Sequence, residues 1–339
     1  MRNTTTPYQN ILIIKPGAVG DLLQMTPVIR ALTACSPKAK ISMLVGSEIT
    51  AALFRNDPRI SETVIFERDG RHRSLSSRLA LWKYLHNKGY DLVLNYQRSN
   101  LKTWFLASAA LPCRVLIYHK AKNRNVHAVV NYLETLMPLG LTPADLDLEL
   151  VLDEGARAYA RDFFSSQGLD GKTVIALNPG ATHAVNRWPT SRFSELADLI
   201  TDQLHACPLI IGGPDDVPLA DDIVARSRTK PVSLAGRTSL LQLGAILEKC
   251  ALLVSGDTGP LHLATAAGTT VIGLFGAADP GRTGPVGKGH RVIQAGKVPC
   301  VPCRSRRCGN QNYLECMESI TASEVADVAA ELLREKVSL

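Results

Sequence analysis

Residues 11–21 read Ile-Leu-Ile-Ile-Lys-Pro-Gly-Ala-Val-Gly-Asp, and this run predicts the class of fold. Its four apolar residues are typical of a buried strand. The small-residue loop after them opens a helix that we expect to begin near Asp21 and to stop before Pro37. Alternation of strands and helices along a chain is typical of α/β proteins with a parallel sheet.

The same alternation of short apolar runs with helical segments continues along the chain. Further strands are expected at 41–45, 63–66, 92–94 and 115–117, and then at 174–177, 209–211, 252–255, 271–275 and 291–293. Leu79, Trp82 and Leu85 are expected to form the apolar stripe of one covering helix. Buried strands separated by helices predict an α/β fold with two doubly wound, Rossmann-like sheets, whose domains face each other across a cleft.

A chain of 339 residues is long for a single hydrophobic core, which favours two domains. The stretch 139–155 is rich in proline, glycine and acidic residues, and we place the boundary close to Gly168. The first domain is therefore expected at 1–167 and the second at 168–320. A capping box at 321–324 predicts a final helix within 321–339, which can pack back on the first domain.

Composition and charge restrict the class of protein. No apolar run approaches the roughly 20 residues of a membrane span, and residues 1–10 are too polar for a signal peptide, so we expect a cytoplasmic protein. Residues 55–124 hold 14 Lys or Arg against 5 Asp or Glu. Such a block suits phosphate-bearing partners or is a solvated face. Its aromatic residues have the spacing of core positions, which argues against nucleic acid.

Four of the eight cysteines, Cys300, Cys303, Cys308 and Cys316, follow a C-x2-C-x4-C-x7-C pattern. This spacing matches no standard zinc module. In a reducing compartment it favours a structural site, with metal or as packed thiols, over a catalytic one. Asp145 and Asp147 form a D-x-D string in the interdomain stretch, where we expect no catalytic metal.

The loop at 15–21 lacks both the G-x-G-x-x-G fingerprint and the Walker ending, which argues against dehydrogenase or ATPase chemistry. Asp21 either meets a ligand there or caps the helix.

Three loops of the second half also follow predicted strands. Residues 256–262 form a glycine-bearing turn into a helix, a geometry that suits phosphate, and His262 is either a ligand contact or a core histidine. The loop at 178–189 offers Thr182 and Arg187, and 212–216 ends in an acid suited to ribose hydroxyls. Together the three loops predict a nucleotide-diphosphate site.

Four motifs occur in order along the chain. They are Lys-Pro-Gly-Ala-Val-Gly-Asp-Leu-Leu-Gln-Met-Thr-Pro (15–27), Asn-Pro-Gly-Ala with Asn-Arg-Trp-Pro (178–189), Gly-Gly-Pro-Asp-Asp (212–216) and Ser-Gly-Asp-Thr-Gly-Pro-Leu-His-Leu-Ala (255–264). In this order they resemble the motifs of glycosyltransferase family 9, over nearly the whole chain. The cysteine-bearing segment 300–320 resembles the ending of many heptosyltransferase II type members.

The resemblance implies an inverting GT-B enzyme that moves heptose from ADP-heptose to the inner core of lipopolysaccharide, with Asp21 as general base and no cofactor. The first domain would bind the acceptor and the second the nucleotide sugar. The donor contacts implied are Gly180, Thr182, Arg187, Asp216, Asp257, Thr258, Gly259 and His262. For the phosphorylated lipid A-core acceptor we expect Lys15, Gly20, Arg68, Arg71, Arg73, Lys120, Lys122 and Arg124.

The expected place of action is the cytosolic face of the inner membrane of a Gram-negative bacterium, with transient contact to that surface. One departure concerns Asn186, where the family often has lysine, so the phosphate-neutralising role passes to Arg187 or Lys15, or the donor differs. Two alternatives stay open: transfer with another nucleotide sugar or acceptor, and a GT-B-type nucleotide-sugar isomerase.

Overall fold

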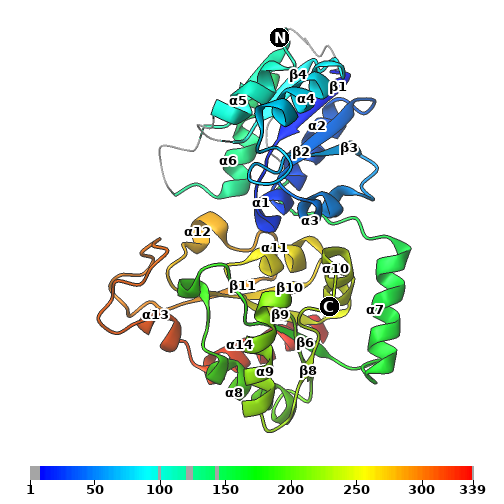
Figure 1. Ribbon diagram of the computed structural model, residues 1–339. Coiled ribbons are helices and arrows are strands. Elements are labelled where there is room, and N and C mark those ends of the chain that lie inside the picture. The colour runs from blue at the N-terminus through cyan, green and yellow to red at the C-terminus, as the bar shows by residue number, and fades with distance from the viewer. Residues whose placement is uncertain (1–7, 98–100, 120–124, 142–144, 338–339) are drawn as a thin grey trace. The chain divides into compact units, whose positions relative to one another are not determined.

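The computed structural model describes residues 8–97, 101–119, 125–141 and 145–337. The chain forms two compact units, Met1–Val151 and Leu152–Leu339 (Figure 1). Each unit is built on one parallel sheet, as the alternation of apolar runs and helices predicts.

The first unit has five parallel strands in the order β3-β2-β1-β4-β5. They are β1 (Asn10–Ile14), β2 (Lys40–Val45), β3 (Ile60–Ile65), β4 (Leu92–Asn95) and β5 (Arg114–Ile117). The apolar run Ile11–Ile14 lies in the central strand and is fully buried, which explains why it has no polar alternation. All five strands lie where the sequence predicts them, although β3 begins three residues earlier than expected.

The single helix expected after β1 is instead two helices, α1 (Val19–Leu23) and α2 (Thr26–Cys35). Pro27 lies in the first turn of α2, where a proline is tolerated because that N–H has no helical partner. The other helical elements are α3 (Glu48–Ala51), η1 (Ala52–Phe54), α4 (Leu75–His86), α5 (Leu101–Ser108), α6 (Ala128–Glu134) and η2 (Met137–Leu139).

The expected apolar stripe of α4 is wrong in one residue. Leu79 is 50% exposed, whereas Leu81 and Leu85 are buried in the core of the first unit and Trp82 packs against it. Residues four apart share a face of a helix, so Leu81 and Leu85 point together into the core while Leu79 lies off that face.

The second unit has six parallel strands in the order β11-β10-β9-β6-β7-β8. They are β6 (Val174–Asn178), β7 (Cys207–Ile210), β8 (Val232–Ser233), β9 (Leu252–Gly256), β10 (Thr270–Phe275) and β11 (Arg291–Gln294). The two-residue strand β8 is missing from the prediction because it carries no apolar run. Helices α8 (Thr190–Asp202) and α9 (Val217–Arg226) supply buried residues to the core on one face of this sheet.

The boundary near Gly168 is placed too late by the sequence. Helix α7 (Glu154–Ser166) belongs to the second unit, where it packs on α10 (Leu240–Lys249). Lys249 lies over the Phe164 ring at 5.0 Å, and Arg157 forms an ion pair with Glu248 at 3.0 Å. The amphipathic pattern of 154–166 marks a helix without indicating which core receives its apolar face.

The last helix, α14 (Ala322–Val337), also belongs to the second unit, so the expectation that it packs back on the first domain is wrong. It contacts α8 and β10, and Val325, Ala326, Ala329 and Leu332 lie in the core of the second unit. Its buried face is thus fully used within its own unit.

The remaining helical elements of the second unit are short and lie near strand ends. They are η3 (Ala184–Asn186), η4 (Pro214–Asp216), α11 (Gly259–Ala266), α12 (Pro280–Thr283) and α13 (Glu315–Glu318).

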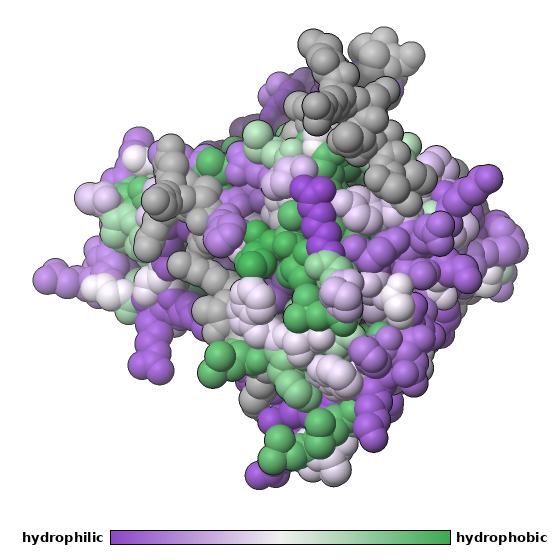
Figure 2. Space-filling model, turned by 90° about the horizontal axis from the view of Figure 1, so that it is seen from above, coloured by the Kyte–Doolittle hydropathy of each residue, from purple (hydrophilic) through white to green (hydrophobic). Residues whose placement is uncertain are grey.

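Within the described ranges, every helix is too short or too polar to cross a membrane. Figure 2 shows hydrophobic side chains grouped among hydrophilic ones on one face.

Candidate functional site

Each sheet has one point at which successive crossovers leave in opposite directions. In the first unit it lies between β1 and β4, and in the second between β6 and β9. Open α/β sheets bind ligands at such a switch point, beyond the carboxyl ends of the strands. The loop after β1 leads into the first turn of α1, which carries Asp21, and the loops that carry Thr182 and Asp257 follow β6 and β9.

Asp21 is the third residue of α1, and the N-cap position belongs to Ala18. Its carboxylate is held by two side chains on the same oxygen. The Tyr132 hydroxyl donates to Oδ1 at 2.9 Å, and Lys15 Nζ lies 3.2 Å from the same atom. Lys15 Nζ also donates to the Tyr132 hydroxyl at 2.8 Å, which closes a triangle of contacts.

The electrostatics of this triangle favour an ionised carboxylate. The Lys15 side chain is 10% exposed and that of Asp21 is 42% exposed. Burial alone raises the pKa of Asp21. However, the Lys15 ammonium and the hydrogen bonds from Tyr132, Lys15 and the Ala18 N–H outweigh it, so the pKa lies below its ordinary value. Burial and the negative charge of Asp21 raise the pKa of Tyr132, which therefore stays a hydrogen-bond donor.

Glycine at position 17 allows the turn to close on this triangle. A Cβ atom there would lie 3.0 Å from Asp21 Cβ and 3.2 Å from Lys15 Cε. Tyr132 comes from α6, and its ring lies 4.6 Å from Lys15 Nζ. Tyr96, directly after β4, donates to the Tyr132 carbonyl at 3.1 Å and packs its ring against the Tyr132 ring. Nothing in the sequence indicates this role of Tyr132, because an aromatic residue in a helix has the pattern of an ordinary core residue.

The cations expected to meet the acceptor are only partly brought together. Lys15 lies beside Asp21, and Gly20 is buried within α1. Arg68 lines a pocket of about 480 Å³ with Pro16 and Gln97, close to the loop of Asp21. Arg68 pairs with Asp69 at 3.0 Å, and Arg71 pairs with Glu48 and Glu67, at 3.3 and 3.6 Å.

The ion pairs of Arg68 and Arg71 compensate part of the positive charge of the basic block at residues 55–124, which therefore carries less free charge than the sequence suggests. Arg73 is exposed on the same turn. Lys120, Lys122 and Arg124 lie outside the described residues.

The second unit brings the predicted donor residues to one sheet edge. Asn178, at the end of β6, donates through Nδ2 to Ser255 Oγ at 3.0 Å and to Thr258 Oγ1 at 3.1 Å. This contact joins the loops after β6 and β9. Gly256 lies against the backbone of Asn186, because a Cβ atom there would stand 2.4 Å from the Asn186 carbonyl oxygen.

Gly180 and Asp216 are also in contact. A Cβ atom at Gly180 would lie 2.3 Å from the carboxyl atoms of Asp216, and the Asp216 carboxylate accepts a hydrogen bond from the Gly213 N–H at 2.9 Å. The acid predicted for ribose therefore lies directly over Gly180, one of the predicted donor contacts.

The turn into α11 places Asp257, Thr258 and Gly259 at the start of that helix, with Thr258 as N-cap. Asp257 Oδ2 accepts a hydrogen bond from the Thr283 hydroxyl at 3.0 Å, and His262 Nε2 lies 4.0 Å from Asp257 Oδ1. His262 is only 5% exposed, so it is a core residue that also contacts the candidate site.

Thr182 is exposed, and Arg187 donates through Nε to the Ala181 carbonyl at 3.0 Å, which ties this cation to its own loop. Beside them, a pocket of about 200 Å³ is lined by Asp257, Asn186 and His183. The same pocket is lined by three arginines that no sequence motif indicates: Arg282, Arg304 and Arg306.

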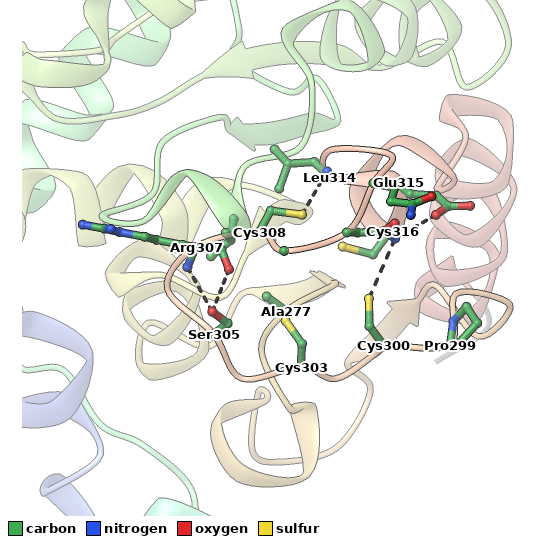
Figure 3. Close-up of a pocket in the computed structure, with 14 residues that line it drawn as sticks. Ala277, Pro299, Cys300, Cys303, Ser305, Arg307, Cys308, Leu314, Glu315 and Cys316 are labelled. Atoms are coloured by element: carbon green, nitrogen blue, oxygen red, sulfur yellow. Dashed lines mark hydrogen bonds between the residues drawn. The ribbon is translucent and has the colours of Figure 1, made fainter.

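All four clustered cysteines line a neighbouring pocket of about 660 Å³ (Figure 3). Cys316 is buried, whereas Cys300 and Cys303 are exposed, and all are free thiols. Across the described ranges, no three His, Cys, Asp or Glu side chains are arranged to hold a metal ion.

Asp145, of the D-x-D string, pairs with Arg30 at 3.0 Å.

Comparison with known proteins places this chain in a family. The glycosyltransferase family 9 (heptosyltransferase) model matches residues 78–314. Lipopolysaccharide heptosyltransferase 3 of Escherichia coli (strain K12) is 29% identical, over 93% of this chain and 96% of the relative. Lipopolysaccharide heptosyltransferase 2 of the same organism is 26% identical, over 84% and 87%.

Solved structures agree with the fold. A glycosyl transferase family 9 structure from Veillonella parvula DSM 2008 has a TM-score of 0.86 at 26% identity and covers 97% of this chain and 98% of that one. The E. coli ADP-heptose lps heptosyltransferase II has a TM-score of 0.79 at 23% identity, with 97% and 99% coverage. The two parallel sheets therefore form a GT-B fold. The family model matches well over half of the chain. The chain therefore belongs to glycosyltransferase family 9, and the predicted resemblance to that family is confirmed.

Proposed function

We propose that this family 9 enzyme transfers heptose from ADP-heptose to the inner core of lipopolysaccharide with inversion at the anomeric carbon. The observation that carries the proposal is the Asp21 carboxylate, held ionised by Lys15 and Tyr132 at the switch point of the first sheet. Support also comes from the curated relatives, which are named lipopolysaccharide heptosyltransferases, and from neighbours described as E. coli WaaC with ADP and with ADP-2-deoxy-2-fluoro heptose.

In the proposed reaction, Asp21 accepts the proton of an acceptor hydroxyl as that oxygen attacks the anomeric carbon. Its two oxygens are differently occupied. Oδ1 is engaged by Tyr132 and Lys15, whereas within the described part of the chain Oδ2 accepts only the long 3.4 Å hydrogen bond from the Ala18 N–H. Oδ2 is therefore the oxygen that we assign to the proton. A carboxylate of lowered pKa is a weak base, so the departing diphosphate supplies much of the driving force.

For the donor, we propose that the second unit binds ADP-heptose at the switch point between β6 and β9. Asp216 would receive the ribose hydroxyls, as acids do in other Rossmann-like sites. The start of α11, with Thr258 and Gly259, and the loop with Gly180 and Thr182 would hold the diphosphate, because free N–H groups at a helix start favour anions. Asp257 and His262 would face the sugar, and Arg187 would add positive charge.

We further propose that the enzyme works at the cytosolic face of the inner membrane. Helices α4 and α5 pack on each other and expose large apolar side chains: Leu75, Leu79, Leu101, Trp104 and Phe105. Such side chains at a helical surface suit shallow, reversible contact with a lipid interface, where the lipid-linked acceptor is held.

The test is release of ADP from ADP-heptose with a heptose-deficient, deacylated lipopolysaccharide core as acceptor. We expect release only when the acceptor is present, and nuclear magnetic resonance of the product should show an inverted anomeric centre. UDP- and GDP-sugars are the matched donor controls. Conversion of the donor without acceptor would indicate an isomerase instead, and turnover of a UDP- or GDP-sugar alone would refute the assignment of ADP-heptose.

A further inference from the structure

The pocket beside Asp257 is basic, and its arginines come from two segments that lie outside the four ordered motifs. Arg282 lies in α12, and Arg304 and Arg306 lie on the loop that carries the clustered cysteines. Asp257 follows β9 and α12 follows β10, so the pocket stands at the carboxyl edge of the second sheet. This is the edge at which sheets of this kind bind ligands.

The pocket holds more positive than negative charge. Arg304 pairs with Asp279, whose carboxylate also accepts the Gly281 N–H at the start of α12, at 3.0 Å. Among the contacts of the described residues, the side chains of Arg282 and Arg306 take part in no ion pair or hydrogen bond. Asp257 is the second acidic residue that lines the pocket. The guanidinium groups of Arg282 and Arg306 therefore outnumber the remaining carboxylate and can face a ligand.

The loop that carries Arg304 and Arg306 also lines the pocket of the four clustered cysteines, here called the cysteine pocket, and is fixed by hydrogen bonds there. Ser305 and Ala277 line both pockets, and the Arg304 N–H donates to the Ala277 carbonyl at 2.7 Å. Cys308 Sγ accepts the Leu314 N–H at 3.3 Å (Figure 3).

The far end of the same loop packs closely on the chain after β10. A Cβ atom at Gly276 would lie 2.7 Å from both Cys316 Sγ and Met317 Sδ. These contacts hold the loop against the end of β10, so its arginines are presented at a fixed place.

We propose that Arg282, Arg304 and Arg306 form an anion subsite that binds a phosphate group of the nucleotide-sugar donor. The guanidinium fork matches phosphate oxygens in bidentate hydrogen bonds, whereas the strongly hydrated head of lysine acts as a point charge. The donor is the assigned source of the phosphate because Asp257, at the start of α11, lines the same pocket. This inference rests on the proposed donor function and adds a residue set to it.

The experiment is calorimetric titration of ADP, adenosine and pyrophosphate into the full-length protein and three variants at one ionic strength. Arg282→Gln and Arg306→Gln remove the unpaired guanidinium groups. Arg307→Gln is the matched control, because Arg307 adjoins Arg306 and carries the same charge but lines the cysteine pocket. We expect Arg282→Gln and Arg306→Gln each to weaken ADP and pyrophosphate binding by about 10- to 100-fold, with adenosine binding unchanged. Arg307→Gln should bind all three like the wild type.

Several outcomes separate this inference from the proposed function. If Arg282→Gln and Arg306→Gln bind ADP as Arg307→Gln does while Gly180→Ala weakens ADP binding, the subsite is wrong and the donor site stands. If Arg282→Gln and Arg306→Gln keep the wild-type ADP affinity but raise the KM for a phosphorylated acceptor, the subsite binds a phosphate of the acceptor. That result would overturn its assignment to the donor. Arginine-dependent pyrophosphate binding by a protein that does not bind ADP would support the subsite and refute the proposed donor.

Discussion

The Tyr132 hydroxyl donates a 2.9 Å hydrogen bond to Asp21 Oδ1 from a helix 111 positions further along the chain. Lys15 bridges the same two groups, at 2.8 Å from the hydroxyl and 3.2 Å from the carboxylate. Hydrogen bonds and a cation on one carboxylate oxygen fix the orientation of the carboxylate and favour its ionised form. The arrangement therefore prepares Oδ2 of Asp21 to receive a proton.

Tyr132→Phe should shift the pH dependence of turnover. In the wild type the pKa of Asp21 is lowered, in part by Tyr132, so the base is ionised above that pKa and activity is lost as the pH falls through it. Loss of the hydroxyl removes one lowering contribution. The acid limb of the kcat/KM profile should therefore move to higher pH, with ADP affinity unchanged.

Tyr84→Phe is the matched control for that profile, since Tyr84 is an exposed tyrosine of α4 in the same unit. A Tyr132→Phe profile that overlays the wild-type and Tyr84→Phe profiles would mean that Tyr132 does not act on the base.

Gly180→Ala should weaken ADP binding. Its Cβ atom would stand 2.3 Å from the Asp216 carboxyl atoms, so the Asp216 side chain must move away from the place proposed for ribose. We expect a loss of affinity of about tenfold or more, as for a lost hydrogen bond to a charged group. Gly213→Ala is the matched control, because its Cβ atom would lie 3.7 Å from Asp216 Oδ2, an ordinary contact. Equal ADP affinities in the two variants, by calorimetry, would contradict the assignment of Asp216.

The cysteines should react with iodoacetamide in a definite order. Burial raises the pKa of Cys250 to about 12, and burial with the neighbouring thiols raises the pKa of Cys316. The thiolate is the reactive form, so both should react slowly at pH 8, after the exposed Cys300 and Cys303. Peptide mass spectrometry over a time course gives the order. Early labelling of Cys316 would contradict its burial in the cysteine pocket.

Most of the sheet architecture is predictable from the sequence, because buried parallel strands are continuous apolar runs that end in glycine-bearing loops. The β1 and β9 runs each lead into such a loop, and both loops lie at a switch point. β8 has only two residues, and the α7 pattern fits either core, so β8 and the domain boundary were not predictable from periodicity.

The contacts around the site are harder to predict because they depend on distant segments. Lys15 and Tyr132 are brought together only by the packing of α6, and nothing in their spacing indicates the contact. Similarly, Arg282, Arg304 and Arg306 follow no motif of nucleotide sites. They share a pocket with Asp257 only because α12 and the cysteine-bearing loop fold onto the same sheet edge.

The most direct test of the account is the turnover of Asp21→Asn, which keeps the size of the side chain and removes its basicity. We expect kcat to fall by about 10²- to 10⁴-fold, the contribution typical of general-base catalysis, while ADP affinity stays near wild type. The melting temperature should drop without loss of the fold, because the buried Lys15 loses its charged partner but keeps an oxygen to which it can donate. Glu134→Gln, an exposed acid on α6, is the control and should turn over normally. Near-normal turnover of a well-folded Asp21→Asn enzyme would contradict the assignment of Asp21 as the base.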